Sequence, residues 1–141
     1  MLATNESRTL PARPEALEAL HEMLDRFWSA VESARGGPVS PNPRHGLAIA
    51  AAEVAANIIR YAQADSFEFS LTLHGNTVEA RFIDAGVPFL GVADGHLDPE
   101  LLAEGGMGLA LAKRGLDSFG YQRLANQTNC WTLVLLLPVP T

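Results

Sequence analysis

The chain has 141 residues, 48% hydrophobic and 18% charged, so it is long and apolar enough for one globular domain and is not a disordered protein. Its formal net charge is −6 and it has no cluster of Lys or Arg, which argues against binding to nucleic acid or to an anionic membrane. The single cysteine, Cys130, can form no internal disulfide, the first residues lack the apolar core of a signal peptide, and no apolar run is long enough to span a bilayer. We therefore expect a soluble cytoplasmic protein with a single domain over residues 1–141, frayed at residues 1–6.

The first third of the chain predicts an edge strand, a helix and a loop. Residues 7–13 are expected to form a short edge strand that stops at Pro14, because proline cannot donate a hydrogen bond to a neighbouring strand. Residues 14–33 follow with apolar side chains at helical spacing, and proline suits the first turn of a helix. Residues 34–43 are rich in Gly and Pro and predict a loop. The apolar stripe of the helix consists of Leu17, Leu20, Leu24, Phe27 and Val31.

Residues 45–63 predict the central helix of the protein. Ile49, Ala52, Ala56 and Ile59 recur at spacings of three and four residues, so they share one helical face. This face is expected to be buried in the core.

The central helix also carries a polar stripe, because Glu53 and Asn57 lie one turn apart and Arg60 continues the same line. Two interpretations are open. The stripe is either the solvated outer face of the helix, or a site in which a carboxylate base and a metal-binding amide are held at fixed spacing on a rigid element. Motifs further along the chain decide between them.

The rest of the chain predicts mainly strands. Residues 66–74 alternate apolar and polar side chains, Gly75 and Asn76 form a two-residue turn signal, and residues 77–83 alternate again, which predicts a hairpin. The elements expected after it are a long connection over residues 87–105 with a helical turn at 99–103, a third helix over 106–119, and a closing hairpin over 121–125 and 131–139.

Strands that lie in hairpins pair antiparallel, and amphipathic helices bury their apolar stripes against one face of the resulting sheet. The sequence therefore predicts an α+β fold. This fold is a two-layer α/β sandwich in which three helices cover one face of a mixed, mostly antiparallel sheet. The alternation in residues 66–74 agrees with a second face that meets solvent.

Two short motifs have the chemistry of a nucleotide site, although each also has a simpler explanation. Asp84 can accept a hydrogen bond from an amino group and Gly86 lets a flat ring approach the backbone, yet Asp and Gly after a strand commonly form an ordinary turn. Gly105, Gly106 and Gly108 precede a helix, where N–H groups and the helix dipole favour an anion, yet a glycine-rich hinge explains them equally well. No Walker A sequence follows, and the βαβ context of the dinucleotide fingerprint is missing.

The order of three motifs carries more weight than any one of them. The chain has a helix with Glu53 and Asn57, then a strand that ends in Asp84 and Gly86, then the sequence Glu-Gly-Gly-Met-Gly-Leu from Glu104 at the start of a helix. This arrangement resembles the ATP-binding domain of the GHKL superfamily, whose fold is the Bergerat α/β sandwich. Over nearly the whole chain, it is most similar to the small stand-alone serine kinases that act as anti-sigma factors, the RsbW/SpoIIAB type.

The resemblance implies a role for each motif residue. Asn57 would hold the Mg²⁺ that bridges the triphosphate, and Glu53 would be the general base. Asp84 would accept a hydrogen bond from the adenine amino group, with Gly86 beside the ring. The loop over residues 87–105 would close over the nucleotide. Further nucleotide contacts would come from Gly106, Met107, Gly108 and Leu109 near the phosphates and from Thr132 near adenine.

The resemblance also implies a function and partners. The chain would be a serine/threonine kinase that uses Mg·ATP to phosphorylate a STAS-domain anti-anti-sigma factor, with a sigma factor as its second partner and a homodimer as its assembled form. One alternative is a non-catalytic, ATP-gated module that binds a protein partner, and another is a kinase-like regulator of a different switch. The sequence departs from the family at Tyr61, where many relatives have His, and at Asn129, Cys130 and Trp131, where a Gly is common before Thr132.

Overall fold

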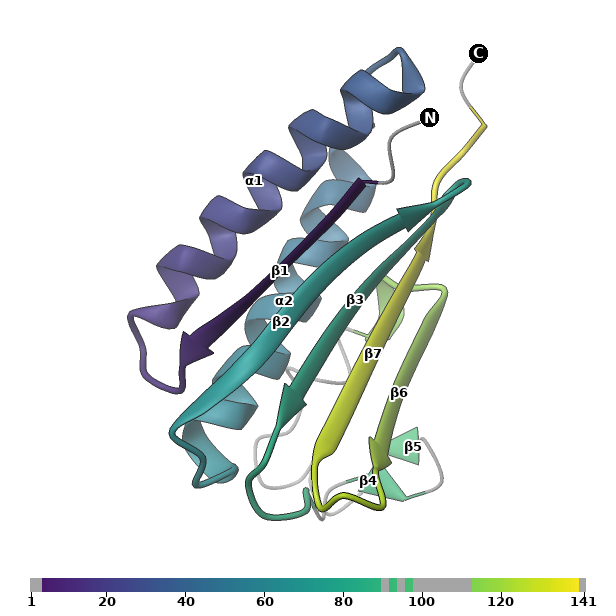
Figure 1. The fold of residues 1–141 in the computed structure, drawn as a ribbon. Helices are drawn as coiled ribbons and strands as arrows, with labels where there is room; N and C mark the ends of the chain where they lie inside the picture. Colours follow the sequence, from purple (N-terminus) through teal and green to yellow (C-terminus); the bar gives the residue numbers. More distant parts are fainter. Residues whose placement is uncertain (1–3, 90–91, 94–95, 98–112, 140–141) are drawn as a thin grey trace.

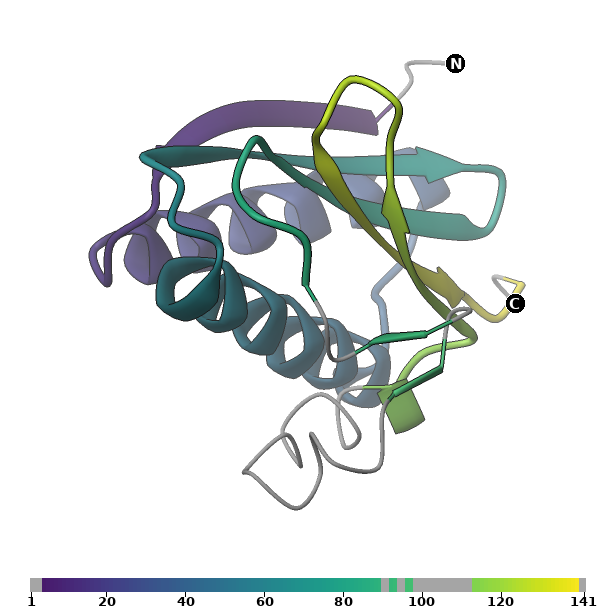
Figure 2. The same ribbon diagram turned by 90° about the horizontal axis from the view of Figure 1, so that it is seen from below.

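The computed structural model describes residues 4–89, 92–93, 96–97 and 113–139. These residues form two layers, a five-stranded sheet and a pair of long helices (Figure 1). Figure 2 shows both helices on the same side of the sheet. The elements in chain order are β1 (Thr4–Pro11), α1 (Ala16–Arg35), α2 (Pro41–Tyr61), β2 (Ser66–His74), β3 (Thr77–Asp84), β4 (Val92–Ala93), β5 (His96–Leu97), β6 (Ser118–Arg123) and β7 (Asn129–Leu136).

The strand order in the large sheet is β1-β2-β3-β7-β6, and every neighbouring pair is antiparallel. β1 lies at one edge, as the sequence predicts, but it spans Thr4–Pro11 rather than residues 7–13, so residues 4–6 pair with β2 and are not frayed. The predicted hairpin is formed by β2 and β3, which turn at Gly75 with a positive φ of 64°. The α+β sandwich is therefore confirmed, although the described part of the chain has a purely antiparallel sheet and two helices rather than a mixed sheet and three.

The inward-facing residues of the sheet carry one acidic side chain into the apolar layer. β2 alternates between buried and exposed residues as predicted, and β3 alternates in the same way, with every second residue from Val78 to Asp84 buried under the helices. Asp84 is the last residue of this series and is only 2% exposed. The alternation of side chains along β3 therefore directs this carboxylate toward the helices, independently of the turn that follows the strand.

The buried face of α2 differs from the predicted one. Ile49 is 55% exposed rather than buried, and Ala52, Ala56 and Ile59 are only half-buried. Because α2 is rich in alanine, apolar residues cover more than one side of it and supply two stripes at helical spacing. The sheet packs on the stripe that consists of Leu47, Ala50, Ala51, Val54, Ala55 and Ile58.

The predicted third helix extends too far along the chain. Its residues up to 112, and the helical turn expected at 99–103, lie outside the described residues. Helical structure ends before Gly115 and β6 begins at Ser118, so Phe119 lies in a strand rather than in the predicted helix. The Phe119 ring packs edge-on against Trp131 with 5.9 Å between centroids, and pairing of β6 with β7 outweighs the local helical pattern. Both strands of the closing hairpin consequently start earlier than predicted.

Candidate functional site

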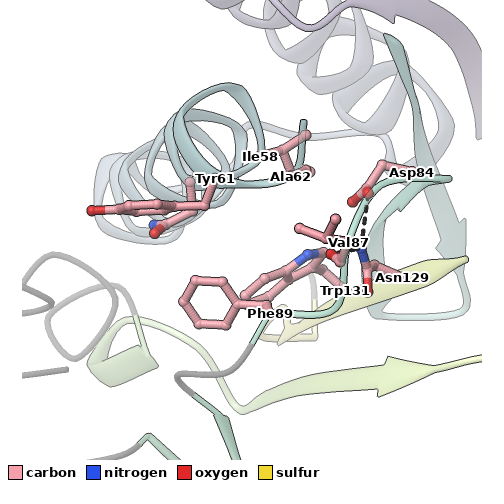
Figure 3. A pocket seen from close by; sticks show the side chains of 9 residues that line it. Ile58, Tyr61, Ala62, Asp84, Val87, Phe89, Asn129 and Trp131 are labelled. Atoms are coloured by element: carbon pink, nitrogen blue, oxygen red, sulfur yellow. Dashed lines mark hydrogen bonds between the residues drawn. The ribbon is translucent and has the colours of Figure 1, made fainter. Parts of the chain in front are cut away.

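A small pocket opens where the C-terminal end of α2 meets the ends of β3 and β7 (Figure 3). Its cavity is small, about 10 Å³, and it opens to solvent. The lining is mostly apolar, and its polar groups come from three separate elements. The lining residues are Asn57, Ile58 and Tyr61 of α2, Ala62 directly after it, Asp84 at the end of β3, Val87 and Phe89 of the following loop, and Asn129 and Trp131 of β7.

Asp84 offers one free hydrogen-bond acceptor to this pocket. Its Oδ1 accepts from the backbone N–H of Gly86 and from Nδ2 of Asn129, both over 2.8 Å. Its Oδ2 is buried and has no hydrogen-bond partner among the described residues. A buried acceptor without a donor costs about 1–3 kcal/mol, so a ligand that brings an N–H or O–H to this oxygen is strongly favoured.

Asn129 is the polar residue of the pocket that the sequence did not indicate as a site residue. It is 1% exposed and lies directly opposite Asp84 in the pairing of β3 with β7. Its Nδ2 also donates to the carbonyl oxygen of Val87 over 2.8 Å, and its Oδ1 accepts from the hydroxyl of Tyr121 and from Nη1 of Arg123. The register of the two strands brings Asn129 to Asp84, and the sequence alone does not reveal this register. The one sequence feature that could have indicated Asn129 is that a polar residue stands at the start of a strand.

Aromatic rings form one wall of the pocket. Phe89 and Tyr121 pack against Trp131 at centroid distances of 5.1 and 4.7 Å, and Tyr61 faces Phe89 across 6.3 Å. Figure 3 shows the rings of Phe89 and Trp131 below the end of α2, where Tyr61 lies. The rings lie at 58–62° to one another, so the wall is apolar and faceted, and a planar ligand can pack against a ring of it beside Asp84.

Gly86 is required by the packing of the chain itself. A Cβ at this position would lie 2.1 Å from the carbonyl oxygen of Ala62, at the end of α2. The next residue, Val87, donates its N–H to the same oxygen over 2.8 Å. The loop after β3 is therefore pressed against the end of α2, which explains the glycine without a ligand. The role of Gly86 beside a bound ring stays a prediction.

Asn57 lines the pocket, and the orientation of its amide suits a metal ligand. Its Nδ2 donates to the carbonyl oxygen of Glu53 over 2.8 Å, one turn earlier in α2. The amide oxygen Oδ1 therefore points away from the helix backbone, and no partner for it is found in the described part of the chain, so it suits a cation. Glu53 is half-buried on the same helix but is not among the residues that line the pocket.

Thr132 does not line this pocket. It follows Trp131 in β7 and pairs with Arg81 and Gly120, so its side chain lies on the open face of the sheet, away from the helices. Its predicted contact with adenine is not supported by this placement, because the inward positions of β7 belong to Asn129 and Trp131. Four further predicted residues, Gly106, Met107, Gly108 and Leu109, lie outside the described residues.

Among the described residues, no group of three or more His, Cys, Asp or Glu side chains could hold a metal ion by itself. Neither described helix is long and apolar enough to cross a membrane. The site is thus a partly apolar pocket with one buried acceptor and one free amide oxygen.

Residues 10–135 match the family described as histidine kinase-like ATPase domain, and the chain belongs to this family. Its fold is similar to that of the Acinetobacter baumannii histidine kinase AdeS, with a TM-score of 0.54 and 15% sequence identity over 94% of this chain and 68% of that chain. No curated protein sequence matches the chain.

The residues present fit the ligands of an ATPase domain. The unpartnered Oδ2 of Asp84 can accept from the amino group of adenine, and the aromatic wall suits a purine ring. The amide oxygen of Asn57, which the Nδ2 bond to Glu53 directs away from the helix backbone, suits Mg²⁺, which keeps several waters and takes few ligands from the protein.

Proposed function

We propose that this protein is an anti-sigma factor serine/threonine kinase, which uses Mg·ATP to phosphorylate a STAS-domain anti-anti-sigma factor. The observation that carries ATP binding is the buried Oδ2 of Asp84, which lacks a hydrogen-bond partner in the described part of the chain and lies in a pocket shared with Asn57. The kinase class is supported by the motifs at Glu53, Asn57 and 104–109, which resemble those of the anti-sigma kinases. A sigma factor as second partner and a homodimer as assembled form belong to the same proposal.

The residues of α2 supply the chemistry of transfer. Asn57 would hold Mg²⁺, which neutralises charge on the phosphate oxygens. The Glu53 carboxylate accepts the proton of the substrate hydroxyl while the hydroxyl oxygen forms a bond to the γ-phosphorus. The bond between this phosphorus and the bridging oxygen of ADP breaks, and ADP leaves. Placing these two side chains on successive turns of one packed helix fixes their spacing, and positioning of this kind supplies much of the rate in phosphoryl transfer.

The test is transfer of labelled γ-phosphate from ATP to purified STAS-domain proteins that carry a serine acceptor. We expect incorporation into one of them, and loss of incorporation when its acceptor serine is changed to Ala. Nucleotide binding is measured on the same samples. If ATP and the STAS partner both bind but no phosphate is transferred, the protein is instead a nucleotide-gated binding module.

A further inference from the structure

The amide of Asn129 is held in one orientation by neighbours whose hydrogen-bonding roles cannot be exchanged. The carbonyl oxygen of Val87 can only accept, so the group that faces it over 2.8 Å must be the donor Nδ2. The guanidinium of Arg123 can only donate, so the group that faces it over 3.1 Å must be the acceptor Oδ1. A flipped amide would lose both interactions, so Nδ2 is kept on the side of Asp84.

Tyr121 reinforces this orientation. Its hydroxyl accepts from the backbone N–H of Phe89 over 2.9 Å and therefore gives its own proton to Oδ1 of Asn129. Arg123 also donates to the carbonyl oxygen of Gly86 over 2.7 Å, which ties the loop after β3 to β6. Two residues of β6 thus determine which side of the Asn129 amide meets the pocket.

We propose that Asn129 is a positioning residue for Asp84, and that it gives the pocket its preference for a purine with an amino group. Asn129 and Gly86 both donate to Oδ1 of Asp84, which fixes the plane of the carboxylate and leaves Oδ2 as its one open acceptor among the described contacts. The torsion that turns a carboxylate is otherwise broad and weakly restrained. The inference rests on adenine nucleotide binding in this pocket, which is part of the proposed function.

A positioning role has a signature that a merely structural role lacks. If Asn129 only supported the fold, its loss would lower the affinity for every purine nucleotide by a similar factor. If Asn129 instead orients the Oδ2 atom of Asp84, its loss lowers the affinity only for nucleotides whose base can donate a hydrogen bond to that oxygen. Purine riboside 5′-diphosphate differs from ADP only in lacking the amino group, so the ratio of the two affinities isolates this contact.

The experiment is calorimetry with ADP and with purine riboside 5′-diphosphate on the wild type and on Asn129→Leu. We expect the wild type to prefer ADP by roughly tenfold, and Asn129→Leu to reduce that preference to about twofold while binding the amino-free nucleotide almost as before. Asn126→Leu is the matched control, because Asn126 is exposed in the same hairpin and the contact found for its Oδ1 in the described residues is with the Thr128 hydroxyl. It should keep the wild-type preference.

Because Asn129 is buried, Asn129→Leu is first checked by thermal melting, and an exposed position provides a second arm. Arg123→Leu releases the Asn129 amide and should lower the preference for ADP, whereas Arg123→Lys keeps a donor and should restore most of it. Arg81→Leu, on the open face of the sheet, is the control and should change nothing.

A wild type that binds both nucleotides equally, or neither, overturns the inference. So does an unchanged preference in a folded Asn129→Leu or in Arg123→Leu. These measurements need no phosphoacceptor, so a failure of the kinase proposal alone leaves them unaffected.

Discussion

Asp84 and Asn129 occupy directly paired positions on β3 and β7, and the amide of Asn129 donates to the carboxylate of Asp84 over 2.8 Å. Both side chains are almost completely buried, at 2% and 1% exposure. The pair forms the polar floor of a pocket whose other walls are aromatic rings and the end of α2. A carboxylate used in this way accepts two hydrogen bonds from its own chain and keeps one oxygen for a ligand.

The base preference of the pocket follows from that free oxygen. We expect ATP and ADP to bind on the order of tenfold or more tightly than GTP, because guanine places a carbonyl where adenine has its amino group and two acceptors would then face each other. Calorimetry with the three nucleotides measures this. Asp84→Asn should lose most of the preference, and Asp65→Asn, at an exposed position before β2, serves as its control. Equal affinities for ATP and GTP in the wild type would remove Asp84 from this role.

The amide of Asn57 should matter only when the metal is present. Asn57→Ala removes an oxygen that is free to bind Mg²⁺, so Mg·ATP binding should weaken far more than binding of metal-free ATP. Titrations with Mg²⁺ and with EDTA separate the two. Asn42→Ala, an exposed residue in the first turn of the same helix, is the matched control. Wild-type Mg·ATP affinity in Asn57→Ala would return Asn57 to the role of a surface residue.

The loop after β3 makes a prediction about stability that is independent of nucleotide. Gly86→Ala places a methyl group 2.1 Å from the carbonyl oxygen of Ala62, so the loop or α2 must move. We expect a loss of about 1–3 kcal/mol in the free energy of unfolding, measured by denaturant titration. Gly120→Ala should cost much less, because a methyl group added there would meet nothing within 4 Å and the φ of Gly120 is not positive. If both variants unfold at the same denaturant concentration, the close approach at Gly86 does not matter for stability.

The hairpin of β2 and β3 could be predicted from the sequence because both strands and the turn between them carry local signals. Alternation gave the limits of β2 without error, and a two-residue turn gave its hairpin with β3. The buried face of α2 could not be predicted in the same way, because alanine is compatible with either side of the helix and the sheet decides which side is buried. Phe119 shows the same limit, since its place in β6 depends on pairing with β7.

Some residues of the candidate site could likewise be indicated from the sequence, and others could not. Asp84 and Asn57 could be indicated from the order of three sequence motifs and the resemblance that they carry, and both residues line the pocket. Asn129, Tyr121 and Arg123 could not, because their contacts with the loop after β3 depend on strand register between segments distant in the sequence. The expected adenine contact at Thr132 stays a prediction, although the register of β7 with β3 places this side chain on the open face of the sheet rather than in the pocket.

Glu53 distinguishes a kinase from a binding module. Glu53→Gln keeps the shape of the side chain and removes its ability to take a proton, so it should keep most ATP affinity. Phosphate transfer to a STAS partner should fall by roughly 10²–10⁴-fold, the usual contribution of a general base. Glu53→Ala should behave similarly, and a large difference between the two variants would show that orienting the hydroxyl is the main role. Glu22→Gln, at an exposed position on α1, is the control for a lost carboxylate, and circular dichroism must show that α2 is intact. If the wild type transfers phosphate and both Glu53 variants do so at the same rate, the nucleotide site remains but the proton of the substrate hydroxyl is taken by another group.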